Sequence, residues 1–281
     1  MTILAALSLF LVISSGLARP DGPNVEPEYL DHLLATEQYE LFAEIMNIPD
    51  AKLVRPNEDE RNENPMLNKE LEMGDILPAF GPLKEESRQG IRFDRYPGSK
   101  WPNGYIPYHL NTNDFTQSQR DTINNAINSW NRQVNCLKLR PRTNEADYVY
   151  VFSGNGCWSY LGKIGGEQGL SLQRNGCVWT GTVIHEFEHA AGFAHEQNRL
   201  DRDNHVEVLW NNIPDEWKSQ YEKTNSRDFG LQQSYDYYSI MHYPMKAPGT
   251  NNDAFRILAN GIDTRRIGNG NDFTETDIRK I

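Results

Sequence analysis

Residues 185–203 read HEFEHAAGFAHEQNRLDRD and contain three of the chain's seven histidines. His185 and His189 are four positions apart, so on an α-helix their imidazoles lie on one face, about one turn from each other. Two imidazoles placed in this way can bind one zinc ion, and the adjacent Glu186 can hold a water molecule on that ion. The alternative for two histidines at this spacing is a polar surface or a partly buried, hydrogen-bonded pair.

The residues after His189 favour the zinc site over that alternative. Gly192 can take the left-handed conformation that ends a helix, so we expect the helix to stop there and the chain to turn back. This turn would bring His195 round as a third ligand. Three imidazoles leave one position on zinc open for water, as a catalytic site requires, whereas a structural site normally closes the tetrahedron, commonly with cysteines.

The whole stretch resembles the long motif of the astacin family of metalloproteases, HExxHxxGFxHExxRxDRD, and agrees with it at every fixed position. Downstream, residues 239–243 read SIMHY and are similar to the methionine turn of that family. The resemblance implies that Met241 lies beneath the zinc and that Tyr243 is a fifth, labile ligand. For Met241 the alternative is ordinary core packing.

The resemblance extends over roughly residues 88–281 and implies an α+β fold. The expected catalytic domain, residues 89–281, is zincin- or metzincin-like, with two subdomains, a twisted N-terminal sheet, an active-site helix and an irregular C-terminal part. Strand-like runs are found at 105–110, 136–139 and 148–152. An apolar helical face runs from Phe115 to Val134, with Asp114 or Thr116 as its N-cap.

The activity implied by the resemblance is that of a zinc-dependent metalloendopeptidase acting on protein or peptide substrates, with one Zn²⁺ per catalytic domain. Zinc lowers the pKa of its water and polarises the scissile carbonyl, and Glu186 would act as the general base. Tyr243, by resemblance, would stabilise the oxyanion once substrate binds. We expect the substrate to pair with an edge strand near Leu170 to Gln173. The alternative is a non-catalytic, zinc-binding secreted interaction protein on the same scaffold.

Residues 1–18 are interpreted as a signal peptide. The apolar run at 4–14 is too short to span a bilayer, and the small residues Gly16 and Ala18 suit a secretory cleavage site. The run is not preceded by Lys or Arg, so the alternative is a buried N-terminal strand or helix. We therefore predict a secreted, extracellular product without a membrane partner.

Residues 19–88 are predicted to form an activation pro-segment. Residues 1–88 carry a net charge of −10 and the remainder only −1, so the acidity belongs to the N-terminal third. Neither part has the basic stripe of a nucleic-acid binder. A helix-like spacing at 28–46 precedes a polar, linker-like stretch at 57–64. The segment ends in KEESR at 84–88, where an activating, trypsin-like protease could cut near Arg88.

Two further roles follow from the family resemblance of this pro-segment. Residues 72–75, EMGD, resemble the FxGD motif of astacin pro-segments, although Glu72 stands where phenylalanine is usual. The resemblance implies that Asp75 replaces the catalytic water on zinc in the latent zymogen; the alternative is a simple β-turn. After cleavage, the amine of Gln89 would fold inward beside Glu196 and form a salt bridge, because a buried carboxylate needs a cationic partner.

The chain has three cysteines, an odd number for an exported protein. The resemblance implies a disulfide between Cys157 and Cys177. It also implies a C-terminal partner for Cys136, which this sequence lacks, so the C-terminus is interpreted as truncated or variant. Glu188 introduces a charge into the metal-binding helix where many relatives are apolar, and we expect it to face solvent or a cation.

Overall fold

The computed structural model describes residues 71, 74–77, 91–94, 96–224 and 233–281. All of them belong to one compact unit, Asp50–Ile281. Several predictions from the sequence lie outside the described residues: the signal peptide at 1–18, the helix-like spacing at 28–46, the linker at 57–64 and the cleavage site at Arg88. The candidate metal ligands and the segment around Asp75 lie inside them.

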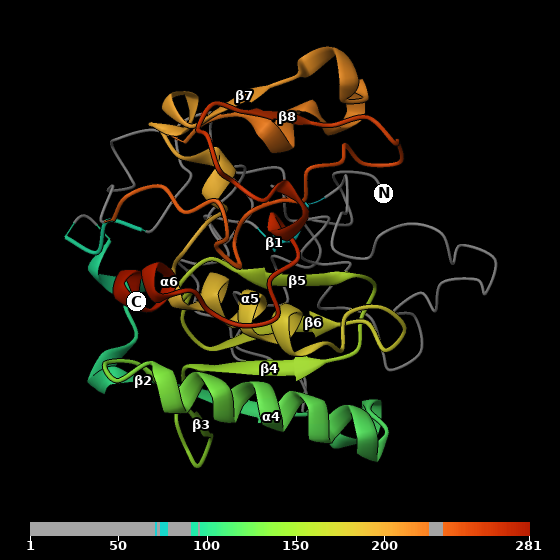
Figure 1. The fold of residues 1–281 in the computed structure, drawn as a ribbon. Helices are drawn as coiled ribbons and strands as arrows, with labels where there is room; N and C mark the ends of the chain where they lie inside the picture. The colour runs from blue at the N-terminus through green and yellow to red at the C-terminus, as the bar shows by residue number, and fades with distance from the viewer. Residues whose placement is uncertain (1–70, 72–73, 78–90, 95, 225–232) are drawn as a thin grey trace, which may run out of the picture. The chain divides into compact units, whose positions relative to one another are not determined.

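One mixed sheet dominates the N-terminal part of the described chain (Figure 1). Its strands are β1 (Ile76–Leu77), β2 (Tyr105–Leu110), β3 (Lys138–Pro141), β4 (Tyr148–Phe152), β5 (Cys157–Tyr160) and β6 (Glu167–Leu172). Their order is β1-β5-β6-β4-β2-β3; β5 and β6 pair antiparallel and the other neighbours pair parallel. In β4, Val149 and Val151 are buried while the alternate aromatic residues are partly exposed, which gives the strand one core face.

The edge-strand prediction near Leu170 to Gln173 is wrong. Strand β6 lies between β5 and β4, and its last residues, Leu170 to Leu172, are all buried. Consecutive burial is typical of an interior strand. The glycine-rich surroundings suggested a loop-bounded edge, but pairing partners depend on distant residues. Beside the metal-binding helix, the sheet ends with β5 and the short strand β1. Strand β1 pairs with the outer side of β5, and Ile76 lies opposite Ser159.

The two helices of this part pack on the core face of the sheet. Helix α4 (Gln117–Gln133) begins after Thr116, whose hydroxyl accepts from Gln119 N in a capping box, as the sequence predicts. Helix α5 (Thr180–Ala191) packs against α4, and Trp130 and Phe187 meet edge-on at 6.5 Å between ring centroids. One hydrophobic cluster joins both helices to the strands.

The C-terminal part is largely irregular, as expected for the α+β fold. It contains the antiparallel pair β7 (Val206–Val208) and β8 (Phe255–Ile257), several short 3₁₀ turns, and the terminal helix α6 (Glu275–Lys280). A second hydrophobic cluster, built on Tyr221, Tyr243 and Phe255, supports it. This cluster is separate from the main cluster of the sheet and helices, in agreement with the predicted two subdomains, and a third, smaller cluster lies around Ile76 and Ile91. None of the described helices combines the length and the apolar character that a membrane span requires.

Candidate metal centre

Helix α5 and the turn that follows it bring the three predicted histidines together. His185 and His189 lie one turn apart on α5, and Gly192 ends the helix with a φ of 111°. The backbone N–H of Gly192 donates to His189 O, which closes the turn that carries the chain to His195. Asp75 approaches the same point, and one ligand atom from each of the four side chains lies within 4.8 Å of the others.

The distances among these four side chains fit a bound zinc ion. His185 Nε2 and His195 Nε2 are 3.3 Å apart, and Asp75 Oδ2 lies 3.1 Å from each of them. A tetrahedral site with zinc–nitrogen distances of about 2.0–2.1 Å has edges of about 3.3–3.4 Å. Within the described chain, His189 Nε2 and Asp75 Oδ1 are buried and make no hydrogen bond, although they are 3.4 Å apart. Buried polar atoms converging on one point need a cation between them.

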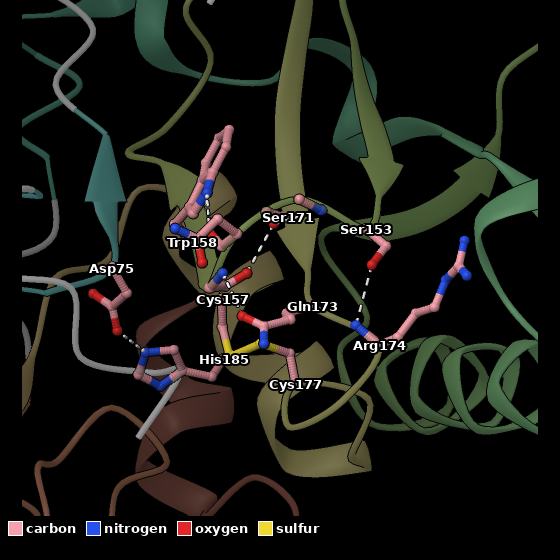
Figure 2. The surroundings of a disulfide bond; sticks show 12 residues. Asp75, Ser153, Cys157, Trp158, Ser171, Gln173, Arg174, Cys177 and His185 are labelled. Atoms are coloured by element: carbon pink, nitrogen blue, oxygen red, sulfur yellow. Dashed lines mark hydrogen bonds and ion pairs between the residues drawn. A yellow bond between two sulfur atoms is a disulfide. The ribbon is translucent and has the colours of Figure 1, made fainter. Parts of the chain in front are cut away.

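Backbone carbonyls orient two of the imidazoles. His185 Nδ1 lies 2.9 Å from Ile240 O, and His189 Nδ1 lies 2.7 Å from Phe193 O. An Nδ1–H that donates to a carbonyl leaves the Nε2 lone pair free to bind a metal. Figure 2 shows the imidazole of His185 directed at the carboxylate of Asp75.

The charges of the cluster also favour a metal ion. Burial lowers the pKa of His189 and takes that of His195 to about 4, although the Asp75 carboxylate acts in the opposite direction. Burial would raise the pKa of Asp75, but the charges of His195 and His189 and a hydrogen bond with His185 hold it well below its usual value. Neutral imidazoles and an ionised carboxylate are the protonation states that bind zinc.

Glu186 lies beside this cluster and has no hydrogen-bond partner among the described residues. Its side chain is fully buried, and both carboxylate oxygens are unsatisfied. Burial and the nearby Asp75 charge raise its pKa well above the usual value. A carboxyl group with a raised pKa beside a metal centre is a candidate general acid and base.

The turn at residues 239–243 packs against the third histidine. Met241 is 1% exposed and belongs to the main hydrophobic cluster, and its carbonyl accepts from Glu196 N at 2.9 Å. The rings of Tyr243 and His195 have centroids 4.6 Å apart, and Tyr243 N donates to Gln197 Oε1. Tyr243 therefore lies beside the third histidine, and the Met241 backbone binds the residue that follows that histidine, whereas their roles at a bound zinc stay predictions.

Glu196 follows the third histidine and is buried in a network of charges. Its Oε2 accepts from Lys280 Nζ at 2.6 Å, and its Oε1 accepts from Arg199 at 3.3 Å and from Asp236 N at 2.8 Å. Burial raises the pKa of Glu196, and Lys280 and Arg199 oppose this shift. The sequence analysis did not identify Lys280, which lies 84 positions away and has no local pattern that links it to Glu196.

Glu188 does not face solvent, so that part of its prediction is wrong. The side chain is fully buried, and neither oxygen makes a hydrogen bond within the part of the chain that the structure describes. Lys280 is among the charged groups that act on it, but carboxylates outnumber this cation, and burial raises the pKa of Glu188 well above its usual value. The reason is tertiary, because charged residues that act on Glu188 come from α6, far along the chain.

A cavity of about 140 Å³ opens beside the metal ligands. Asp75, His185 and Tyr243 form one part of its lining, and small residues from the start of α5 and from the loop before α6 form much of the rest. Gly181 is required here, because a Cβ at that position would lie 2.4 Å from Gly270 O.

The disulfide between Cys157 and Cys177 is present, with a Cα–Cα distance of 5.6 Å (Figure 2). It ties β5 to the segment before α5 and so holds the sheet edge beside the metal-binding helix. Cys136 is free and exposed among the described residues.

Comparisons with known proteins agree with this geometry. The family model for the astacin peptidases matches residues 93–281. Zinc metalloproteinase nas-4 of Caenorhabditis elegans is 38% identical over 215 residues, which cover 74% of this chain and 66% of that protein. High choriolytic enzyme 2 of Oryzias latipes is 42% identical over 146 residues, or 51% of each chain. The chain thus spans less than two thirds of the length of both curated relatives.

A solved structure is similar as well. High choriolytic enzyme 1 of Oryzias latipes (medaka), described as a hatching enzyme zinc-protease, matches with a TM-score of 0.58 and 35% identity, covering 64% of this chain and 90% of that chain. The family model covers most of this chain and includes all three histidines of the cluster. The chain therefore belongs to the astacin family of zinc metalloproteases.

Proposed function

We propose that this chain is a secreted zinc metalloendopeptidase that is made as an inactive zymogen. The observation that carries the proposal is the buried cluster of His185, His189 and His195 with an unsatisfied carboxylate, Glu186, beside it. Three imidazoles and one adjacent carboxylate are the composition of a catalytic, rather than a structural, zinc site. Family membership supports the same activity.

In the proposed reaction, Glu186 takes a proton from the attacking water and later delivers it to the leaving amine. A bound zinc ion would supply a water of lowered pKa and polarise the scissile carbonyl. Tyr243, next to His195, would donate a hydrogen bond to the oxyanion as it develops, a contribution of about 3–4 kcal/mol for comparable donors.

The substrate is proposed to pair with β5, in place of the predicted strand near residue 170. In the uncleaved chain this edge is taken by β1, and Ser159 N donates to Asp75 O at 2.9 Å. A protein or peptide substrate in extended conformation would use the same backbone groups once the pro-segment has left.

Latency is proposed to come from Asp75, which lies 3.1 Å from two of the imidazoles and would replace the water on a bound zinc. The carboxylate is fully buried, and Ile76 and Leu77, which follow it, are buried too. These three residues of the pro-segment are therefore packed into the domain. Cleavage near Arg88 by an activating protease would release it. The signal peptide at residues 1–18 remains part of the proposal, and N-terminal sequencing of the exported protein would test it.

The decisive experiment compares proteolysis by the uncleaved chain, by the trypsin-cleaved chain, and by the cleaved chain after zinc chelation. We expect activity only in the cleaved, zinc-loaded form, with recovery on adding zinc back. A chain that binds one zinc but never cleaves a peptide library would favour the alternative, a non-catalytic zinc-binding interaction protein. Activity that survives complete zinc removal would exclude both.

A further inference from the structure

Glu188 is a buried charged group that the proposed reaction does not use. The charged residues that act on it electrostatically make up, with Glu188 itself, what we call the α5–α6 charge cluster: Glu188, Glu196, Asp236, Asp277 and Lys280. The side chain is fully buried and, within the described residues, neither oxygen accepts a hydrogen bond. A buried carboxylate without a donor is costly, so its presence calls for a partner.

The other carboxylates of the cluster already have donors. Asp277 accepts from Ser239 Oγ at 2.5 Å and from Ile240 N at 3.1 Å. Asp236 accepts from Thr274 Oγ1 at 2.5 Å. Among the described carboxylates of this cluster, Glu188 is the one that lacks a partner.

The two described cations that contact the cluster, Lys280 and Arg199, already pair with these other groups. Lys280 is 8% exposed at its side chain and is shared between Glu196, at 2.6 Å, and Asp277, at 3.7 Å. Arg199 contacts Glu196 at 3.3 Å but also makes two hydrogen bonds with Asp201, at 2.8 and 3.0 Å. Among the described residues, the four carboxylates of the cluster thus outnumber the two cations that contact them.

We propose that Glu188 and Glu196 together form a buried receptor for one additional cation, the α-ammonium group that activation cleavage creates. Glu188 is then the second carboxylate of this receptor. The negative charges of Glu188 and Glu196 together would neutralise the positive charges of Lys280 and the new terminus. This inference rests on the proposed zymogen activation. It adds Glu188, which a pairing of the new terminus with Glu196 alone would not require.

The position of Ile91, at the end of the helix that carries Glu188, supports this contact. Ile91 N donates to Gly192 O at 2.8 Å, and Gly192 follows Glu188 by four residues, which is about one helical turn. Phe193 N donates to Glu188 O, so the chain folds back over the same turn. A terminus at Gln89 lies two residues before Ile91 and can extend by roughly 7 Å, more than the rise of one turn, roughly 5.4 Å.

The test uses Glu188→Gln and Glu196→Gln, each combined with Glu186→Gln so that the cleaved chain cannot digest itself. Glu216→Gln, at an exposed carboxylate, is the matched control. Each zinc-loaded chain is cleaved with trypsin, its new terminus is identified by mass spectrometry, and the rate at which an amine-reactive reagent labels that terminus is measured at neutral pH.

With Glu188 and Glu216 intact, the terminus should be labelled at least about tenfold more slowly than in the denatured chain. Breaking a buried ion pair costs more free energy than a tenfold ratio corresponds to. Glu188→Gln should remove most of that protection, and Glu216→Gln none of it. The uncleaved Glu188→Gln chain should unfold at the same temperature as its parent or higher, whereas the cleaved variant should unfold at a lower temperature. Glu188→Met, which removes all polarity, should show the same reversal.

The outcomes separate the two levels of the proposal. If the parent terminus is labelled as fast as in the denatured chain, the proposed pairing of the new terminus fails, and the role of Glu188 fails with it. If Glu196→Gln exposes the terminus but Glu188→Gln leaves it protected, the pairing with Glu196 stands and the role of Glu188 is refuted.

Discussion

Gly192 and His195 show how a single backbone conformation creates the metal centre. The left-handed φ of 111° at Gly192 reverses the chain, and His189 O accepts the N–H that stabilises this reversal. A residue with a Cβ would be strained there, and its Cβ would lie 3.0 Å from the ring of Phe93. The third imidazole therefore depends on a glycine that binds nothing itself.

Glu186→Gln is expected to retain zinc and lose nearly all peptide hydrolysis in the cleaved chain. Glutamine has nearly the same shape but cannot accept the water proton, and a positioned general base typically contributes about 10²–10⁴-fold. Metal content and the turnover of a fluorogenic peptide are the two measurements. Full turnover in a variant that still holds one zinc would refute the assignment of Glu186 as the base.

His242 should make the stability of the metal-free chain depend on pH. Burial lowers its pKa to about 4, against about 6.5 in the unfolded chain, so the unfolded state binds more protons between these values. The contribution is complete above about pH 6.5 and is lost as the pH falls toward 4, with a slope of up to about 1.4 kcal/mol per pH unit.

Chemical denaturation of metal-free protein at several pH values between about 4 and 7 measures this slope. His242→Gln, which cannot take up a proton, should show a shallower fall. Tyr235→Phe is a useful companion, because it removes the 2.7 Å hydrogen bond to His242 Nε2 and keeps the imidazole. Equal slopes in wild type and His242→Gln would show that this imidazole is not the cause.

Strand β1 is the element that couples the pro-segment to the metal centre. It has two residues, both buried, and it pairs with the sheet edge at β5. Strand β1 directly follows Asp75, so its pairing with β5 fixes the position of the Asp75 carboxylate relative to the imidazoles. A two-residue strand cannot be recognised from its own sequence, since it forms only when the sheet edge is in place.

Asp75→Ala is expected to make the uncleaved chain leak activity. The strand pairing would still cover the sheet edge, but the carboxylate would no longer occupy the position next to His185 and His195. The measurement is peptide hydrolysis by uncleaved, zinc-loaded protein, with Asp94→Ala, at an exposed carboxylate, as the control. Equal background activity in wild type and Asp75→Ala would place the cause of latency elsewhere.

For the whole molecule, the metal centre joins segments that are far apart in the sequence. The histidines lie on α5 and its turn, Ile240 O comes from the methionine turn, and Asp277 of α6 in turn accepts from Ile240 N. A ligand that binds the folded state at a free concentration about 1,000-fold above its Kd stabilises it by about 4 kcal/mol. Zinc is therefore expected to contribute to the stability of the whole domain.

Zinc removal should lower the unfolding temperature of the entire described domain in one transition. Differential scanning calorimetry of chelator-treated and zinc-restored protein is the measurement, and restored zinc should recover the original temperature. An unchanged unfolding temperature after verified metal loss would mean that the cluster is stable without an ion. That result would contradict the expectation based on the unsatisfied atoms of His189 and Asp75.

The sequence predicts the grouping of the three histidines and the helices α4 and α5, though not α6, because the signals for them are local. The i, i+4 spacing of His185 and His189, the helix-ending Gly192 and the capping box at Thr116 each involve residues within one or two turns. The structure has the helix end and the cap where they were predicted. Asp75 was indicated by family resemblance, but its distances to the imidazoles were not.

Long-range pairing decided the rest. The interior position of β6, the contact of Lys280 with Glu196 and the burial of Glu188 all depend on segments tens of residues away. Strand order and ion-pair partners follow from which surfaces meet when the chain collapses, and a local pattern carries no record of its distant neighbour. For that reason the chemistry of the site was apparent from one stretch of residues, whereas its substrate edge and its buried charge cluster required the tertiary fold.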